Sequence, residues 1–357
     1  MKIVTVVGAR PQFIKASALS REIKKHPEIH EVIIHTGQHF DDNMSEIFFR
    51  EMEIPVPKYN LNIHSLSHGS MTGRMLEGIE EILNIEKPDF ILVYGDTNST
   101  LAGALAAKKL NLKVAHVEAG LRSFDMNMPE EINRILTDRI SDILFCPTDV
   151  AVQNLKKEGY DNFNSTIIQC GDIMYDAALF YKSKAELQST ILKDLGLQHD
   201  NYVLATFHRQ ENTDNLFRLR SIVEALNIIH RECQVVVPMH PRTLKIIENQ
   251  KIEVKFKVIN PIGYLDMIAL TSHASMVATD SGGLQKEAYF FGKYCLTLRD
   301  QTEWIELVDG GYNTLTGAET ASIIKAYHQN SGTKKPFDAQ LYGDGHTAKK
   351  IVDALLM

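Results

Sequence analysis

The chain has 357 residues, of which 44% are hydrophobic and 23% charged, and it carries a formal net charge of −7. This length suits two domains that each bury a core, and the negative charge argues against nucleic acid as a general partner. No apolar run is long enough to span a membrane, and the chain begins directly with a strand-like run, so we expect no signal peptide. The four cysteines lie far apart without metal-type spacing, which favours free thiols in a cytoplasmic protein with no metal site.

The first half of the chain alternates between apolar runs and helical segments, as a parallel sheet covered by helices does. The runs that we interpret as strands are residues 2–7, 31–36, 90–94, 113–117, 143–146 and 166–169. Predicted helices separate them, among them residues 13–25, 41–51 and 69–85. We therefore predict a doubly wound α/β domain over residues 1–170.

The second half repeats this rhythm after Gly171-Asp172, where a short strand is followed by a helix with a polar end. Its predicted strands are residues 202–207, 234–239, 255–260, 275–279 and 294–298. Its predicted helices include residues 216–230 and 284–291. This pattern predicts a second domain over residues 171–345. The fold class that we predict is α/β, with two doubly wound parallel-sheet (Rossmann-like) domains that face each other across a cleft.

Three acidic residues occupy successive loops at the same predicted edge of the first sheet. Asp96 and Glu118 each follow a predicted strand, and Glu130 opens the helix that comes next. Each of them alone is typical of a helix cap or a first helical turn. Because the carboxyl ends of parallel strands are where open sheets bind ligands, three acids in this arrangement favour a functional group.

The loop Gly8-Ala9-Arg10-Pro11 follows the first strand, where this fold binds phosphate or sugar. It lacks the GxGxxG fingerprint, so we predict no nicotinamide cofactor. Arg10 and Lys15 flank the loop as candidate ligand-binding cations. The position of Lys15 is equally compatible with a solvated helix residue.

The sequence Ser281-Gly282-Gly283 stands immediately before a predicted helix. Two glycines let the backbone approach an anion closely, and the helix N-terminus favours negative charge. A plain helix N-cap is the simpler alternative. Glu287, one turn into the helix, suits hydrogen bonds from a ribose diol.

His208, Arg209 and His240 follow neighbouring predicted strands and would add hydrogen-bond donors to a diphosphate. The second half therefore indicates a nucleoside-diphosphate site, while the carboxylates of the first half suit proton transfer and oxocarbenium-like sugar carbons. Together these features predict a nucleotide-sugar enzyme. The residues alone leave an epimerase, a hydrolysing epimerase and a glycosyltransferase open, and beside them a non-catalytic UDP-sugar sensor.

Eight motifs spread over nearly the whole chain are specific in combination. They are GARPQFIK at 8–15, YGDTNST at 94–100, HVEAGLRS at 116–123, PEEINR at 129–134, FHRQEN at 207–212, TDSGGLQKEA at 279–288, LRDQTEW at 298–304 and YGDGHTA at 342–348. The set resembles the non-hydrolysing UDP-N-acetylglucosamine 2-epimerases. The resemblance implies the two-domain fold called GT-B, with a last helix, residues 346–357, that packs back on the first domain.

The resemblance also implies a mechanism that needs no cofactor. The family eliminates UDP to form a glycal, protonates the other face of the sugar and adds UDP back. By this resemblance Asp96, Glu118 and Glu130 serve proton transfer and cation stabilisation, while His208 and Lys15 act at the departing diphosphate. The matching ligand-binding positions are Arg10, Arg134, His240, Ser281, Gly282, Gly283 and Glu287.

The chain departs from the commonest family pattern at a few positions. Gln12 stands where many members have Glu, residues 39–41 replace an HRE sequence linked to activation by a second substrate molecule, and residues 123–131 are shorter. These variants resemble the branch that acts on UDP-2,3-diacetamido-2,3-dideoxyglucuronate, because a neutral Gln12 suits a substrate with its own carboxylate. We expect that substrate, or else UDP-N-acetylglucosamine, in a homodimeric enzyme of bacterial surface polysaccharide biosynthesis.

Overall fold

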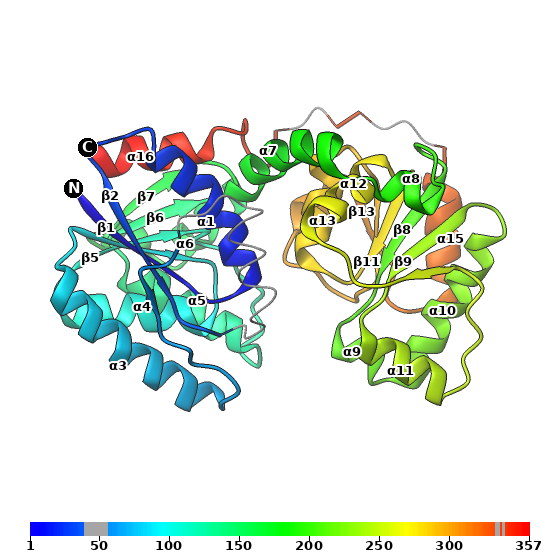
Figure 1. The fold of residues 1–357 in the computed structure, drawn as a ribbon, viewed down its shortest axis with the longest axis horizontal. Coiled ribbons are helices and arrows are strands. Elements are labelled where there is room, and N and C mark those ends of the chain that lie inside the picture. The colour runs from blue at the N-terminus through cyan, green and yellow to red at the C-terminus, as the bar shows by residue number, and fades with distance from the viewer. Residues whose placement is uncertain (39–55, 333–335, 338–339) are drawn as a thin grey trace. The chain divides into compact units, whose positions relative to one another are not determined.

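A computed structural model describes residues 1–38, 56–332, 336–337 and 340–357 of the chain. The chain divides into two compact units, Met1–Ala177 together with Gln340–Met357, and Ala178–Ala339 (Figure 1). The division falls within one helix, α7 (Ile173–Gln188). No helix of the described ranges is both long and apolar enough to cross a membrane.

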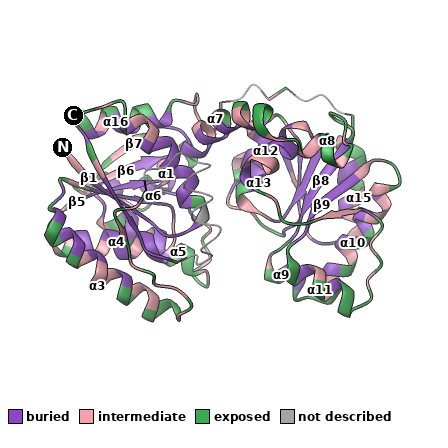
Figure 2. Cartoon of the chain, viewed as in Figure 1, coloured by how far each residue is buried: buried purple, intermediate pink, exposed green. Residues whose placement is uncertain are grey.

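The first unit is built on a seven-stranded parallel sheet with the strand order β3-β2-β1-β4-β5-β6-β7. The strands are rich in Val, Ile and Leu, and they are largely buried, as expected where helices cover both faces (Figure 2). Their bounds are β1 (Lys2–Val7), β2 (His30–His35), β3 (Tyr59–Asn60), β4 (Phe90–Tyr94), β5 (Lys113–Val117), β6 (Ile143–Cys146) and β7 (Thr166–Gln169).

Small side chains let one helix of this unit approach the sheet closely. A methyl group at Gly103 would lie 3.2 Å from side-chain atoms of both Val6 and Val93, so a larger residue there would require these neighbours to shift. Helix α4 packs between α3 and α5, and α16 packs on α1. The helices are α1 (Arg10–Ile23), α3 (His68–Glu86), α4 (Asn98–Lys109), α5 (Pro129–Ile140), α6 (Asp149–Lys157), the short 3₁₀ helix η1 (Tyr160–Asn162) and α16 (Thr347–Leu356).

The second unit has a six-stranded parallel sheet with the order β10-β9-β8-β11-β12-β13. Its strands are β8 (Tyr202–Thr206), β9 (Gln234–Pro238), β10 (Lys257–Ile259), β11 (Met276–Thr279), β12 (Cys295–Thr297) and β13 (Asn313–Leu315). Its helices after α7 are α8 (Ile191–Leu195), α9 (Gln210–Thr213), α10 (Leu216–His230), α11 (Pro241–Asn249), α12 (Tyr264–His273), α13 (Gly282–Phe290), α14 (Ile305–Asp309) and α15 (Thr320–Asn330).

The predicted fold class, two doubly wound parallel α/β units, is confirmed. The predicted loop after β1 is shorter than expected, because α1 already begins at Arg10 and includes Pro11 in its first turn, where a missing N–H costs nothing. Two short strands, β3 and β13, were not predicted. The predicted helix over residues 41–51 lies outside the described residues.

Candidate functional site

In the first unit, Asp96 and Glu118 follow neighbouring parallel strands. The last residues of β4 and β5, Tyr94 and Val117, pair directly in the register of the sheet. Gly95 then turns the chain with a φ of 61°, and its N–H donates to the Val117 carbonyl oxygen at 2.9 Å. The two carboxylates therefore leave the same edge of the sheet, as the sequence predicted.

Each of these carboxylates has a cationic partner. Lys15 Nζ on α1 lies 2.6 Å from Glu118 Oε2, and Arg134 on α5 forms an ion pair with Asp96. Both cations are largely buried, with 7% and 8% of their surfaces exposed. Lys15 was predicted to act at the departing diphosphate and Arg134 to bind the ligand, and the structure brings both together with the two acids. The result is a compact group of alternating charges at one sheet edge.

Burial raises the pKa of Asp96 above its ordinary value, and the nearby Glu118 carboxylate acts in the same direction. The cations of Arg134 and Lys15 oppose this shift without cancelling it. A carboxyl group whose pKa is raised in this way is closer to the range in which it can exchange a proton at neutral pH.

The backbone of Glu118 adopts a conformation that is uncommon outside glycine. Its φ is 72°, in the left-handed region. The N–H groups of Glu118 and Ala119 both donate to the Phe145 carbonyl oxygen, at 3.1 and 3.0 Å, which holds the turn. Gly120 follows with a φ of 80°, and a side chain there would lie 2.5 Å from the Ala151 carbonyl oxygen. Strained backbone of this kind is typical of functional sites.

Glu130, the third acid predicted for this group, is exposed in the first turn of α5. Its neighbour Glu131 is the one that is buried against Arg134, and it also accepts hydrogen bonds from the Ser123 and Phe124 N–H groups at 2.9 Å. Burial raises the pKa of Glu131, but the hydrogen bonds from Ser123 and Arg134 lower it below its ordinary value. Glu131 therefore acts as a fixed anion that orients Arg134.

Gln12 does not lie open to a ligand, contrary to the charge argument made from the sequence. It is only 1% exposed, and its side chain is satisfied internally. The carbonyl oxygen accepts from the Gly8 and Ala9 N–H groups at 2.8 and 3.0 Å, and the amide donates to the Tyr94 carbonyl oxygen at 2.9 Å. Gln12 thus ties the start of α1 to the end of β4.

The second unit places its predicted residues at the carboxyl edge of its own sheet. His208 and Arg209 follow β8, and their N–H groups donate to the Asp280 carboxylate at 3.0 to 3.1 Å. The rings of His208 and His240 are 6.4 Å apart. Partial burial lowers the pKa of His208 below 6.5, although the Asp280 carboxylate acts in the opposite direction. A neutral imidazole is therefore favoured at neutral pH.

Helix α13 begins at Gly282, with Ser281 as its N-cap. The two glycines differ in their surroundings. A side chain at Gly282 would lie 2.4 Å from Glu303 Oε1, whereas one at Gly283 would meet only Ser281 Oγ at 4.0 Å. Glu287 is buried further along α13 and accepts a hydrogen bond from the Tyr264 hydroxyl at 3.1 Å. The helix start thus leaves backbone open at Gly283, as an anion site needs.

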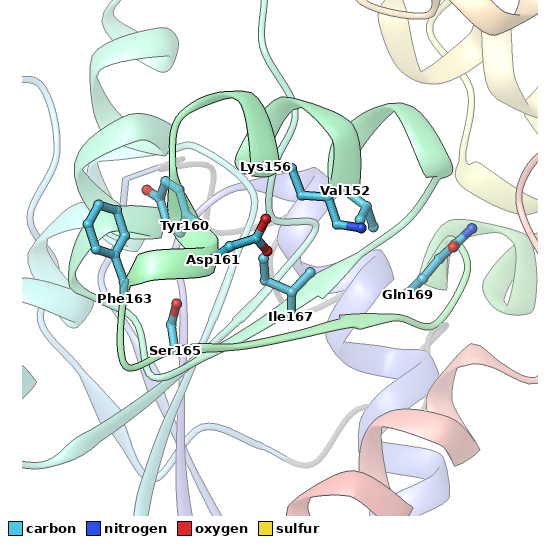
Figure 3. A pocket seen from close by; sticks show the side chains of 8 residues that line it. All are labelled: Val152, Lys156, Tyr160, Asp161, Phe163, Ser165, Ile167 and Gln169. Atoms are coloured by element: carbon cyan, nitrogen blue, oxygen red, sulfur yellow. The ribbon is translucent and has the colours of Figure 1, made fainter.

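A pocket of about 430 Å³ lies at the β7 edge of the first sheet and contains none of the predicted site residues (Figure 3). Side chains from α6, η1 and β7 surround it. Its lining residues are Val152, Lys156, Tyr160, Asp161, Phe163, Ser165, Ile167 and Gln169. The strand-end group of each unit therefore remains the candidate site of that unit.

The sequence predictions missed three residues that hold the first group together. Glu131 was passed over for its neighbour, and His116 and Asp138 were not singled out at all. His116 lies within an apolar strand, and Asp138 lies near the end of α5, 22 positions later. Arg10, one of the predicted ligand-binding residues, is the first residue of α1.

Comparison with known proteins gives matches over almost the full length. The sequence profile described as UDP-N-acetylglucosamine 2-epimerase matches residues 21–356. The UDP-2,3-diacetamido-2,3-dideoxy-D-glucuronate 2-epimerase of Pseudomonas aeruginosa is 55% identical in an alignment that covers 99% of each chain. The crystal structure of Methanocaldococcus jannaschii UDP-GlcNAc 2-epimerase in complex with UDP-GlcNAc and UDP is 44% identical, with a TM-score of 0.89 over 100% of this chain and 99% of that chain. The UDP-GlcNAc 2-epimerase from Neisseria meningitidis bound to UDP-GlcNAc is 31% identical, with a TM-score of 0.89 and full coverage of both chains.

Proposed function

We infer that the chain, which belongs to the UDP-N-acetylglucosamine 2-epimerase family, is a UDP-sugar 2-epimerase that inverts carbon 2 of a UDP-linked 2-acetamido sugar. The observation that carries this proposal is the pair of carboxylates, Asp96 and Glu118, on adjacent strand ends. A base on one face and an acid on the other are what an inversion through a planar carbon requires. Two acids held by separate cations supply such a pair.

The reaction that we propose proceeds by elimination and re-addition. A carboxylate removes the proton from carbon 2, the bond from carbon 1 to UDP breaks with its electron pair, and a glycal forms. A carboxyl group then protonates carbon 2 from the opposite face, and the UDP oxygen attacks carbon 1. The raised pKa of Asp96 suits either direction of proton transfer, and Lys15 and Arg134 offset the negative charge of the group.

The second unit is proposed to hold UDP. The open backbone at Gly283 and the N-terminus of α13 suit a phosphate, and a neutral His208 can donate one hydrogen bond to it without a fixed charge. Arg209, His240, Ser281 and Glu287 complete the ligand-binding set proposed for this unit. In the first unit, Arg10 and Arg134 are the proposed ligand-binding residues, and Glu130 is proposed to take part in proton transfer. The described residues offer no group of three or more metal-ligand side chains, and no step of the proposal requires a metal.

We propose UDP-2,3-diacetamido-2,3-dideoxyglucuronate as the substrate, with UDP-N-acetylglucosamine as the alternative. The first choice is supported by the 55% identity to the Pseudomonas aeruginosa enzyme over 99% of both chains. The alternative is supported by the lower identities, 44% and 34%, to UDP-N-acetylglucosamine 2-epimerases of Methanocaldococcus jannaschii and Escherichia coli. We further propose a cytoplasmic homodimer that serves bacterial surface polysaccharide biosynthesis. Residues 39–41, which replace the HRE sequence that the family links to activation, lie outside the described residues.

The test is a turnover assay with the two UDP-sugars side by side in deuterium oxide. We expect the epimer of the preferred sugar to form and to carry deuterium at carbon 2. An epimer without deuterium would exclude the proposed mechanism. Release of free sugar with equal UDP would instead identify a hydrolase, transfer to an added acceptor would identify a glycosyltransferase, and binding without turnover would identify a sensor.

A further inference from the structure

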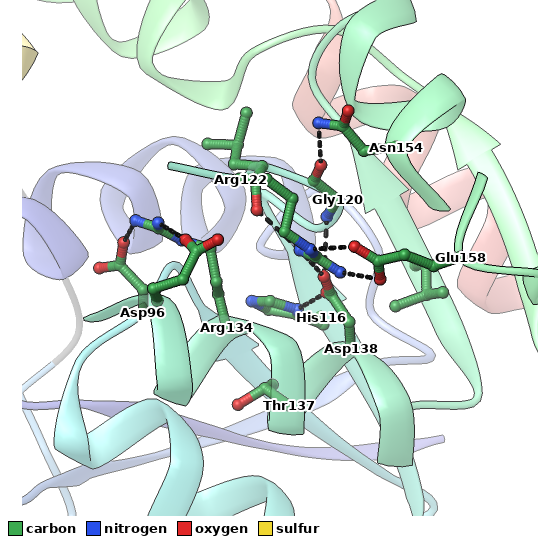
Figure 4. A network of polar contacts seen from close by, with 12 residues as sticks. Asp96, His116, Gly120, Arg122, Arg134, Thr137, Asp138, Asn154 and Glu158 are labelled. Atoms are coloured by element: carbon green, nitrogen blue, oxygen red, sulfur yellow. Dashed lines mark hydrogen bonds and ion pairs between the residues drawn. The ribbon is translucent and has the colours of Figure 1, made fainter. Parts of the chain in front are cut away.

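A polar network with a buried centre contacts the turns that carry Asp96 and Glu118, and the proposed chemistry assigns it no role (Figure 4). Its centre is Asp138 on α5. One carboxylate oxygen of Asp138 accepts a hydrogen bond from His116 Nδ1 at 2.7 Å. The other accepts from the Gly120 N–H at 3.1 Å and from Arg122 Nη1 at 2.6 Å. Every donor points at a carboxylate that has no exposed surface.

The network reaches both catalytic turns from this one residue. His116 Nε2 lies 2.7 Å from the carbonyl oxygen of Gly95, the residue directly before Asp96. On the other side, Asp138 holds the N–H of Gly120, two residues after Glu118. A single buried carboxylate therefore connects the two turns that present the proposed acid and base.

The two ring nitrogens of His116 each have one polar partner. A carbonyl oxygen can only accept, so Nε2 donates to Gly95. Nδ1 lies 2.7 Å from Asp138 Oδ1, on the opposite side of the ring. The orientation of the imidazole is therefore set from both sides.

Arg122 connects the buried carboxylate of Asp138 to the protein surface. It donates through Nε and Nη2 to the two oxygens of Glu158, at 2.7 and 2.8 Å, and the Glu158 side chain is 34% exposed. The ion pair of Arg122 with Asp138 is itself buried. Buried ions persist when each is paired and hydrogen-bonded in this way.

We propose that His116, oriented by Asp138, is a positioning residue that fixes the Gly95 carbonyl and so aims the Asp96 carboxylate, while Asp138 fixes the Glu118 turn through Gly120. The proposal rests on the proposed roles of Asp96 and Glu118. Helix α5 completes the arrangement, because its Asn133 donates to the Asp96 carbonyl oxygen at 2.9 Å and its Arg134 pairs with the Asp96 side chain. Charge-assisted hydrogen bonds of this type hold geometry more firmly than neutral ones.

The kinetic test uses His116→Gln and Asp138→Asn in the full-length protein. Neither amide can supply the lost set of donors and acceptors, so the Gly95–Asp96 turn should shift. We expect kcat to fall about a hundredfold, the usual cost of a small misplacement of catalytic groups. KM should stay within about threefold, because neither residue is proposed to touch the substrate. An unchanged kcat in both variants would overturn the proposal.

A matched control separates positioning from a merely structural role. Glu86 is also a buried carboxylate of the first unit, bound by Lys2, Lys58 and Tyr59, and it has no contact with either turn. Glu86→Gln should lower thermal stability and leave kcat within about twofold. A fall in kcat equal to that of His116→Gln would show that loss of stability alone explains the effect, and the positioning role would be wrong.

Nuclear magnetic resonance of ¹⁵N-histidine-labelled protein tests the hydrogen bond from His116 to Gly95 directly and does not depend on turnover. We expect a ring that carries a proton on Nε2, and we expect its signal to disappear in His116→Gln. A His116 ring without a proton on Nε2 would overturn the assignment. If the wild-type protein turned over neither UDP-sugar, the proposed function would fail, while a crystal structure of His116→Gln would still decide positioning by whether Asp96 leaves Arg134.

Discussion

The two units present their strand-end residues by different physical means. In the first unit, charged side chains are buried and paired, as Lys15 is with Glu118 and Arg134 with Asp96. In the second, main-chain N–H groups are the main hydrogen-bond donors: they bind the Asp280 carboxylate, and they are open at the start of α13. The first arrangement suits acid–base chemistry, since pairing with a cation changes the pKa of a carboxyl group. The second suits binding, since backbone donors recognise phosphate without a titrating charge.

The largest expected effect comes from Glu118→Gln. The amide has almost the same shape, but it loses the charge that faces Lys15 and cannot exchange a proton. We expect kcat to fall about a hundredfold or more, with UDP affinity changed only a few-fold. Steady-state kinetics and calorimetry with UDP measure the two quantities. If UDP binding weakens as much as turnover slows, the division of labour between the units is wrong.

Glu287→Gln should give the reverse pattern in the second unit. The amide oxygen can still accept from the Tyr264 hydroxyl, so the fold should be preserved. Loss of the charge should weaken UDP binding about tenfold, because hydrogen bonds to charged groups contribute more than those to neutral groups. Calorimetry with UDP checks this expectation, and turnover at saturating substrate serves as the control. A variant with normal UDP affinity and lowered kcat would contradict the comparison.

The glycines at the start of α13 offer a sharper contrast within one site. Gly282→Ala places a methyl group against Glu303, which is ion-paired with Arg299, so stability should fall by about 1 kcal/mol. Gly283→Ala meets nothing closer than 4.0 Å and should leave the thermal midpoint unchanged. If an anion rests against this backbone, Gly283→Ala should nevertheless weaken UDP binding. Thermal melts with and without UDP separate the two effects.

The smallest expected effect is a dependence of stability on pH. Hydrogen bonds from Lys2, then from Lys58 and Tyr59, lower the pKa of Glu86 from 4.5 to about 2. The stabilisation is therefore fully present above pH 4.5 and is lost as the pH falls towards about 2. Exposure of Lys2 and Lys58 to water keeps it modest. Urea unfolding of wild type and Glu86→Gln at several pH values should converge in acid, and a constant gap between them would contradict this account.

The sequence supported the fold and the main carboxylates because their signals are local. Apolar runs that end in Gly-Asp or Glu-Ala-Gly mark strand ends, and neighbouring strand ends share an edge. The eight motifs also identified the family, which the profile and the relatives confirm. The predicted acid–base and binding roles remain predictions.

The rest depended on distances that a sequence does not contain. Glu130 and Glu131 are adjacent, and only the direction of α5 decides which of them meets Arg134. His116 reads as one polar residue in a core strand until Asp138 and the Gly95 carbonyl are seen beside it. The charge argument made for Gln12 could not take its burial into account, because a position in a motif does not show whether a side chain is buried.

The left-handed backbone of Glu118 has a consequence for how the protein can change. A non-glycine residue in that conformation costs on the order of 1–3 kcal/mol, which glycine would avoid and asparagine would reduce. Selection for thermostability alone would therefore replace Glu118 and lose the carboxylate. Relatives or laboratory variants that keep glutamate at this position at high temperature would have to be stabilised elsewhere in the sheet. The residue found at position 118 therefore shows whether selection acted mainly on stability or on activity.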